Sequence, residues 1–217
     1  MASRELTSQP VVVIWVADNN AFYSLGKSSV LNTAATRAAT AQCKPKVIVA
    51  IANDLKPEYE AIDAKRKSEF EVHFVSTVNE LKSLVSAQTQ VMFVHDAARP
   101  LTSIKTFQSA LDAVRTGAAA ARPAHVVVDT LKQIDSNRLV TATIDRNSVQ
   151  ALTSPECYWV SSITNESPTD GWSFSIEPSE SKSLVQGDLE SIRVRCAEDV
   201  VLVESFLEWE RINHSSS

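Results

Sequence analysis

Four apolar segments that can each form a buried strand follow one another in the first half of the chain. They are residues 11–17, 46–52, 71–75 and 90–96, and polar segments with helical periodicity separate them. Continuous apolar strands that alternate with amphipathic helices are typical of a mostly parallel sheet with helices on its faces. The sequence therefore predicts an α/β fold, whose ligands bind beyond the carboxyl ends of the strands.

The second half of the chain departs from this alternation. Residues 103–117 form one more predicted helix. Residues 124–144 contain two short β-prone runs around a polar DSN turn, which predicts a projecting β-hairpin arm. Since such an arm lies outside the sheet, we expect it to form a contact between subunits.

The last third contains fewer regular segments. Residues 161–183 are rich in Ser, Pro and Glu and read as a loop. Two late short strands are predicted at 182–187 and 190–194, followed by an amphipathic helix at 197–212. Residues 213–217 are predicted to be a disordered tail.

Length and composition favour one domain, residues 1–217. The net charge of −5 and the lack of a basic tract argue against a nucleic-acid partner. No apolar run reaches the roughly 20 residues that span a bilayer, and the start lacks the core of a signal peptide, so we expect no membrane contact and a cytoplasmic protein. Cys43, Cys157 and Cys196 are widely spaced, which suggests neither a disulfide nor a metal site.

The segment AFYSLGKSS, residues 21–29, fits a permissive phosphate-loop pattern ending in Gly26, Lys27 and Ser28. A phosphate loop wraps its ligand with successive backbone N–H groups and needs glycines that let the chain approach. This segment instead carries large side chains such as Phe22, and the whole chain has only 4 glycines. We therefore predict a turn ahead of a helix rather than a nucleotide cradle.

The stretch VMFVHDAARP is the most informative one, because it places His95, Asp96 and Arg99 at the end of a buried strand. It resembles the HDAARP signature of the methylerythritol phosphate cytidylyltransferases, which join CTP to a polyol phosphate in isoprenoid biosynthesis. VVVDTLKQID, IDRNSVQALTSP and VQGDLESIRV resemble later motifs of that family in the same order. The resemblance covers nearly the whole chain. It implies a three-layer, Rossmann-like nucleotidyltransferase fold.

The resemblance also implies site residues. Arg146 and Arg193 are the implied catalytic residues, which hold the phosphate of the substrate. The implied substrate-binding residues are Asp96, Arg99, Thr130, Thr169 and Arg195. Arg99 and Thr130 are expected to come from the arm of a neighbouring subunit, which implies a homodimer. Arg193 replaces a lysine of the family pattern, and its planar fork is not a geometric copy of an ammonium group.

The nucleotide half of the family pattern is largely missing. The family grips the triphosphate with a glycine-rich loop that carries an arginine and a lysine, whereas this chain reads VADNN and then AFYSL. Each charge-assisted contact contributes about 1.5–3 kcal/mol, so we expect weak or lost CTP turnover. Mg²⁺ is expected with CTP if the protein is active, and no cofactor otherwise; the nucleotide-binding residues stay unknown. The alternative is a non-catalytic pseudoenzyme that binds a sugar phosphate or serves as a regulatory subunit.

Each candidate residue also has a structural interpretation. Asp96 and Arg99 could simply pair with each other at a strand end. Arg146 could be an exposed residue at a helix start. Thr130 and Thr169 could serve only their turns. The sequence leaves these alternatives open.

Overall fold

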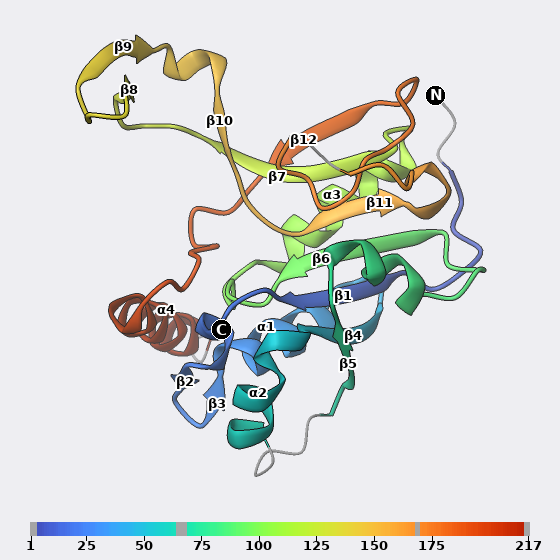
Figure 1. Ribbon diagram of the computed structural model, residues 1–217. Helices are drawn as coiled ribbons and strands as arrows, with labels where there is room; N and C mark the ends of the chain where they lie inside the picture. Colours follow the sequence, from blue (N-terminus) through green and yellow to red (C-terminus); the bar gives the residue numbers. More distant parts are fainter. Residues whose placement is uncertain (1–3, 64–68, 168–169, 215–217) are drawn as a thin grey trace.

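The computed structural model describes residues 4–63, 69–167 and 170–214. A mixed sheet forms the core, with its strands in the order β10-β7-β11-β6-β1-β4-β5 and with β12 paired to β7 (Figure 1). The strands are β1 Val11–Val16, β4 Lys46–Ala52, β5 Glu71–Val75, β6 Val91–Asp96, β7 Ala120–Val126, β10 Gln150–Leu152, β11 Glu156–Trp159 and β12 Lys182–Gln186. Strands β6, β1, β4 and β5 are mutually parallel. This confirms the predicted α/β class.

Three helices cover one face of the sheet: α1 Val30–Ala39, α2 Lys56–Asp63 and α3 Ile104–Arg115. Leu31 of α1 and Phe107 of α3 pack with Val12 and Phe93 of the strands in one buried cluster, and Tyr59 of α2 packs against it. The helix starts are local in origin. The side chains of Ser29 and Ser103 cap α1 and α3 by accepting a backbone N–H.

The other face of the sheet is covered by the 3₁₀ segment η3 Val78–Leu84, by η5 Val160–Ser162 and by Ile163, Trp172, Phe174 and Ile176. We predicted an ordinary helix between β5 and β6, and this prediction was wrong. Only Leu81 of η3 is buried. A short segment with one buried side chain gains little to offset the cost of nucleating an α-helix, so it closes in the tighter 3₁₀ form.

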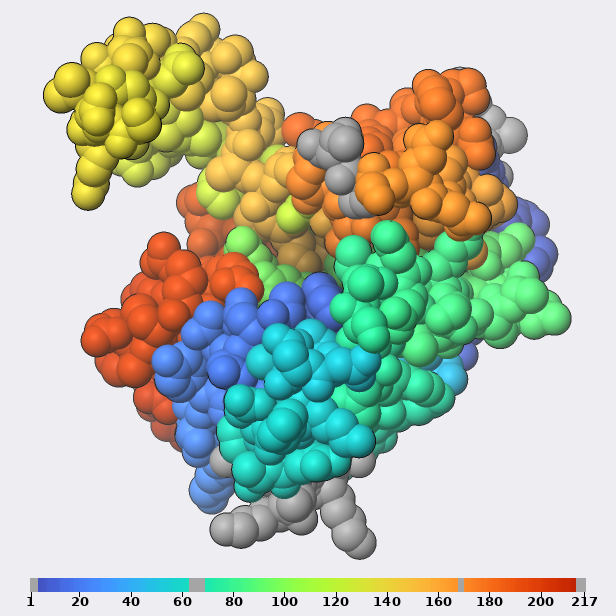
Figure 2. Space-filling model, in the orientation of Figure 1, coloured from blue at the N-terminus to red at the C-terminus, as the bar shows by residue number. Residues whose placement is uncertain are grey.

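The hairpin arm consists of β8 Leu131–Ile134 and β9 Val140–Ile144, which pair only with each other in the described chain. It stands clear of the body in both views (Figure 1, Figure 2). We predicted that the arm begins at residue 124, but residues 124–126 belong to β7, where they pair with β10. The arm returns to the sheet through η4 Arg146–Ser148.

A second small hairpin, β2 Ser24–Leu25 with β3 Ser28–Ser29, follows η1 Asn19–Phe22. The remaining elements are η2 Asn53–Leu55 and the closing helix α4 Ala197–His214. Leu25, Val30, Leu101 and Val203 form a third buried cluster, which joins the small hairpin and α4 to the body. This cluster places α4 beside the edge where β1 and β6 end.

Candidate functional site

Strands β1 and β6 bring two loops together at one edge of the sheet. They are parallel neighbours, and Trp15 of β1 lies opposite Asp96 of β6. The chain leaves β1 toward Asp18 and leaves β6 toward Arg99. Because parallel strands end at the same edge, these side chains meet where α/β sheets bind ligands.

A third segment, residues 188–196, crosses this edge and is held there by hydrogen bonds. Val194 donates its N–H to the carbonyl of Ala98 at 2.8 Å. The hydroxyls of Ser191 and Thr102 lie 2.7 Å apart, and the carboxylate of Asp188 accepts the N–H of Ser103 at 2.8 Å. We predicted a strand at 190–194, which was wrong, because these residues bond to the loop after β6 instead of to a neighbouring strand.

This crossing segment carries Arg193 into contact with both loops. Its Nε donates to Asp96 Oδ2 at 2.8 Å, and its Nη2 donates to Asp18 Oδ2 at 2.5 Å. Arg99 Nε lies 3.4 Å from the same oxygen of Asp96. We call Asp18, Asp96, Arg99 and Arg193 the charge network. Its two carboxylates and two guanidinium groups sum to no net charge.

Backbone contacts hold the network side chains in place. The second oxygen of Asp96 accepts the N–H of Ala98 at 3.0 Å, and the second oxygen of Asp18 accepts the N–H of Asn20 at 3.0 Å. Arg99 donates to the carbonyl of Ser191 at 2.5 Å. Each carboxylate therefore uses one oxygen for its own turn and the other for an arginine.

Burial and charge act in opposite directions on the two arginines. The pKa of Arg99 lies below its ordinary value, because burial lowers it by more than the adjacent Asp96 raises it. Burial also acts to lower the pKa of Arg193, but its hydrogen bonds to Asp18 and Asp96 outweigh this and raise the pKa. Both groups stay cationic at neutral pH, so the network can offer positive charge to an anion once a carboxylate moves aside.

His95 lies behind the network and has no exposed surface for a ligand. It is 1% exposed, and its Nδ1 lies 2.9 Å from Ser154 Oγ. The same hydroxyl oxygen accepts the N–H of Asp96 at 2.9 Å. Burial lowers the pKa of His95 to about 4, so the ring is neutral at pH 7. Its role is to hold the end of β6.

Three other site residues implied by the resemblance, among those that the structure describes, form no hydrogen bond or ion pair with the network. Arg146 is exposed and donates to the carbonyl of Val128 at 2.7 Å. Thr130 is exposed at the start of the arm. Arg195 pairs with Asp199 at 3.2 Å, with its side chain 72% exposed. Thr169 lies outside the described residues.

The structure corrects one assignment and adds one residue. Arg99 was expected on an arm, but it lies in the loop after β6, three residues from Asp96 in the same chain. Asp18 was not among the candidate site residues. Its position just past the first buried strand was the available signal, because that is where a parallel sheet presents polar groups.

The segment that fits a permissive phosphate-loop pattern, residues 21–29, ends in the β2–β3 hairpin ahead of α1. Lys27 is exposed in the turn between β2 and β3. Gly26 adopts a positive φ of 56°, which glycine tolerates without strain, and its N–H donates to Glu204 of α4 at 3.0 Å. The carboxylate of Glu204 thus occupies this N–H, and the segment forms the predicted turn ahead of a helix.

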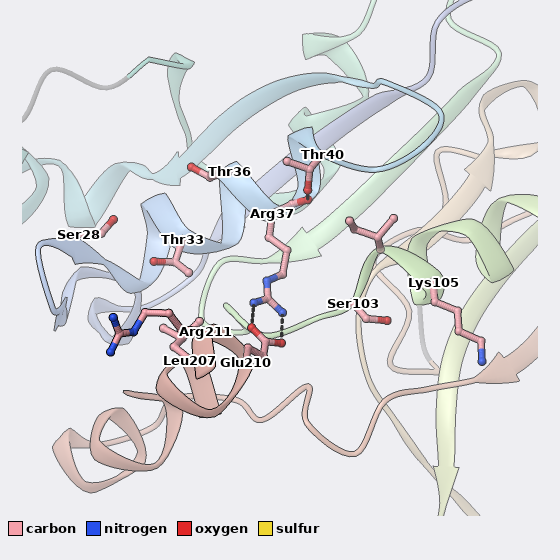
Figure 3. Close-up of a pocket in the computed structure, with 11 residues that line it drawn as sticks. Ser28, Thr33, Thr36, Arg37, Thr40, Ser103, Lys105, Leu207, Glu210 and Arg211 are labelled. Atoms are coloured by element: carbon pink, nitrogen blue, oxygen red, sulfur yellow. Dashed lines mark hydrogen bonds and ion pairs between the residues drawn. The ribbon is translucent and has the colours of Figure 1, made fainter. Parts of the chain in front are cut away.

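A separate groove of about 790 Å³ lies between α1, the start of α3 and α4 (Figure 3). Its lining includes the hydroxyls of Thr33 and Thr36 and the side chain of Lys105. Arg37 and Glu210 form two hydrogen bonds across it, at 3.2 Å and 2.5 Å. None of the charge network lines this groove. Its ion pair joins α1 to α4, which suits a structural contact.

Two features are absent from the described part of the chain. No group of three or more His, Cys, Asp or Glu side chains could hold a metal ion. No helix among the described residues has the length and apolar character that crossing a bilayer requires.

Comparisons with known proteins agree on one family. The family model for 2-C-methyl-D-erythritol 4-phosphate cytidylyltransferase matches residues 14–209. An enzyme of this name from Streptomyces coelicolor is 31% identical over 135 residues, which cover 57% of this chain and 50% of that protein. The one from Bacillus anthracis is 27% identical over 180 residues, 76% of this chain and 78% of that protein. The chain thus aligns with about half the length of the Streptomyces relative.

Solved structures show the same fold. The 4-diphosphocytidyl-2C-methyl-D-erythritol synthase from Anaerococcus prevotii superposes with a TM-score of 0.71 at 20% identity, over 92% of this chain and 96% of that chain. The cytidylyltransferase from Thermus thermophilus superposes with a TM-score of 0.69 at 20% identity, over 91% and 98% of the two chains.

Proposed function

This chain belongs to the 2-C-methyl-D-erythritol 4-phosphate cytidylyltransferase family, and we propose that it binds a polyol phosphate but transfers CMP from CTP weakly or not at all. The observation that carries this proposal is the loop after β1. It offers a triphosphate neither glycine nor a cation, and it places Asp18 on Arg193. The second reading, a pseudoenzyme that acts as a binding or regulatory subunit, rests on the same observation.

The charge network supports the acceptor half of the proposal. A phosphate monoester needs donors in a fork geometry, which the guanidinium of Arg193 supplies. Hydroxyls of a polyol need acceptors, which the carboxylate of Asp96 supplies. Both groups lie together at the carboxyl edge of the sheet, and backbone contacts orient Asp96 before any ligand arrives.

The reaction of the family makes clear what this chain lacks. An oxygen of the acceptor phosphate attacks the α-phosphorus of CTP, a new P–O bond forms, and the bond to the β-phosphate breaks to release pyrophosphate. The protein contributes positioning and charge stabilisation, while Mg²⁺ enters with the nucleotide. Here Arg193 is the one cation of the network that faces the loop after β1, and Asp18 neutralises it. We therefore propose little stabilisation of the transferring phosphoryl group.

A homodimer through the arm belongs to the proposal. The arm and its approach expose apolar side chains: Val128, Ile134, Leu139 and Val140 are 72%, 54%, 64% and 63% exposed. An isolated two-stranded hairpin is marginally stable in water, so a partner that covers these side chains would stabilise it. The approach to the arm and its return also carry Thr130 and Arg146, which a second copy would bring toward a network. Light scattering of the purified protein tests this, and a monomer would contradict it.

Calorimetric titration tests the function. We expect methylerythritol phosphate to bind, and CTP with Mg²⁺ to bind weakly and to release pyrophosphate slowly in the presence of the acceptor. Binding of the acceptor without any CTP binding would favour the pseudoenzyme reading. Rapid release of pyrophosphate, at the rate of an ordinary family member, would contradict the proposal.

A further inference from the structure

We infer that Asp18 is a specificity-determining residue, an internal anion that must leave Arg193 before a ligand phosphate can take its place. The inference rests on the proposed function only in treating Arg193 as the phosphate-binding group.

Arg193 already uses two of its nitrogens in hydrogen bonds to carboxylates. Its Nε bonds to Asp96 and its Nη2 bonds to Asp18. These two nitrogens form one edge of the planar guanidinium, which is an edge that binds a carboxylate or phosphate in a bidentate manner. Because each of these nitrogens already donates to a carboxylate, a phosphate gains the contact with Nη2 only by displacing Asp18, and the contact with Nε only by displacing Asp96.

Asp18 is the carboxylate that a ligand would displace. Asp96 touches Arg193 and also lies 3.4 Å from Arg99, so two cations hold it. Asp18 has Arg193 as its one ion-pair partner in the described part of the chain. Its side chain is also the more exposed of the two, at 37% against 26%. The displacement therefore opens the side of Arg193 that faces the loop after β1.

The position of Asp18 is nevertheless defined before a ligand arrives. Its second oxygen caps η1 by accepting the N–H of Asn20. Ala21 and Phe22 of η1 are buried, and the ring of Phe22 packs on Tyr59 with centroids 6.2 Å apart. The loop thus holds the carboxylate toward Arg193, and moving it breaks a cap as well as an ion pair.

The charges indicate which ligands the site accepts. The two arginines of the network only balance the charge of Asp18 and Asp96, so no positive charge is left over for a ligand. Each phosphate group added beside these carboxylates is therefore repelled by them. A singly phosphorylated polyol adds the least negative charge of the family's ligands. Nucleoside triphosphate and pyrophosphate add the most. Asp18 therefore selects a phosphate monoester over a polyphosphate.

Replacement of Asp18 by Asn tests this directly. The variant removes the charge, keeps the size and keeps an oxygen that can accept the N–H of Asn20. Calorimetric titration of the full chain with inorganic pyrophosphate, at fixed ionic strength, is expected to show binding roughly tenfold tighter than in the wild type, or about 1.4 kcal/mol. Unchanged or weaker pyrophosphate binding overturns the inference.

The chain offers a matched control. Asp135 caps a turn in the arm by accepting the N–H groups of Asn137 and Leu139, both at 2.9 Å. Asp135→Asn removes the same charge from the same kind of turn, away from the network. We expect its pyrophosphate affinity to equal that of the wild type. An equal gain in both variants would mean that net charge alone acts, and this would overturn the inference.

A double variant locates the effect. In Asp18→Asn combined with Arg193→Gln, the gain in pyrophosphate affinity is expected to disappear, because the cation that Asp18 competes for is gone. A gain that persists would overturn the inference. Should Asp18→Asn fail to fold, as judged by its melting curve, Asp18→Ser keeps a capping oxygen without the charge and gives the same test.

The readout separates this inference from the proposed function. Pyrophosphate binding requires neither CTP nor turnover. Rapid CMP transfer by the wild type would contradict the proposed function, while tighter pyrophosphate binding by Asp18→Asn would still support the role of Asp18. Slow transfer with no effect of Asp18→Asn on pyrophosphate binding would support the proposed function and overturn the inference.

Discussion

Two arginine–carboxylate networks in this molecule use the same chemistry in different surroundings. The charge network lies at the strand ends, where the side chains of Asp18 and Arg193 are 37% and 30% exposed. A second network, which we call the buried network, consists of Arg122, Glu156 and Tyr158. There the side chains of Glu156 and Arg122 are 7% and 17% exposed, and their N–O distance is 2.7 Å.

The buried network binds the protein to itself. Glu156 accepts the N–H of Ser173 at 2.8 Å and the hydroxyl of Tyr158 at 2.5 Å. Arg122 donates to the carbonyls of Thr153 and Gly171, at 2.8 Å and 2.6 Å. Burial raises the pKa of Tyr158 far above its ordinary value, and the adjacent Glu156 adds to this. Every partner is another part of the chain, so this network attaches residues 171–174 to the sheet.

The comparison shows that the type of ion pair does not decide its role. In the buried network, backbone groups and the hydroxyl of Tyr158 satisfy the charges. In the charge network, each carboxylate keeps one oxygen on an arginine that a phosphate can also bind. We propose that solvent exposure and the choice of partners distinguish the structural network from the one to which we assign a ligand. The following predictions test this distinction in order of expected size.

The largest effect is expected from Glu156→Ala. The change leaves Arg122 buried with no carboxylate, which typically costs about 3–5 kcal/mol. Urea unfolding at pH 7 measures this loss. The matched control is Glu177→Ala, which removes an exposed carboxylate from the same region and is expected to leave the free energy of unfolding nearly unchanged. A small cost for Glu156→Ala would contradict the structural role of the buried network.

A pH effect of nearly the same size is expected from His95, which touches both the site and the Ser154 segment next to the buried network. Its pKa is about 4 in the folded protein and about 6.5 when unfolded. The unfolded state therefore binds the proton first. The contribution of His95 to the free energy of unfolding is therefore fully present above pH 6.5. It is lost as the pH drops toward 4, and the total loss is about 3 kcal/mol.

Urea unfolding at several pH values checks the prediction for His95. The variant His95→Asn removes the titrating ring, so its stability is expected to depend less steeply on pH between 6.5 and 4 than that of the wild type. Equal slopes for the two proteins would mean that His95 is not held neutral in the folded state.

The charge network is expected to respond in ligand binding more than in stability. Arg193→Ala removes the fork that we assign to the acceptor phosphate, and we expect a loss of roughly 10- to 100-fold in affinity for methylerythritol phosphate. Because the side chains of Arg193 and Asp18 are 30% and 37% exposed, the free energy of unfolding is expected to change by about 1 kcal/mol or less. A large loss of stability in Arg193→Ala, with unchanged affinity for methylerythritol phosphate, would mean that the charge network has a structural role like that of the buried network.

The smallest effect is expected from Arg195→Ala, two residues further along. Arg195 is exposed and paired with Asp199, and this pair raises its pKa. Titration with methylerythritol phosphate is expected to show an affinity within about twofold of the wild type, as is usual for an exposed pair. A loss as large as that for Arg193→Ala would support the substrate-binding role that the family resemblance implies for Arg195.

The sequence by itself determined the features that depend on local pattern. Strands β1, β4, β5 and β6 were predictable because buried parallel strands need continuous apolar runs. The caps at Ser29 and Ser103 were predictable because a cap bonds within its own turn. The family followed from short motifs, and one of them placed Asp96 at the edge of the sheet.

Only the tertiary structure decided which charges meet. Arg193 lies 97 residues from Asp96 and 175 residues from Asp18 along the chain. Residues 190–194 have the pattern of a strand, yet they cross the strand ends, because the loop after β6 offers the carbonyl that accepts the N–H of Val194. A periodic pattern reports how a segment packs on its neighbours, but not which distant side chain completes its hydrogen bonds. The pairing of Asp18 with Arg193 therefore became visible only in the fold.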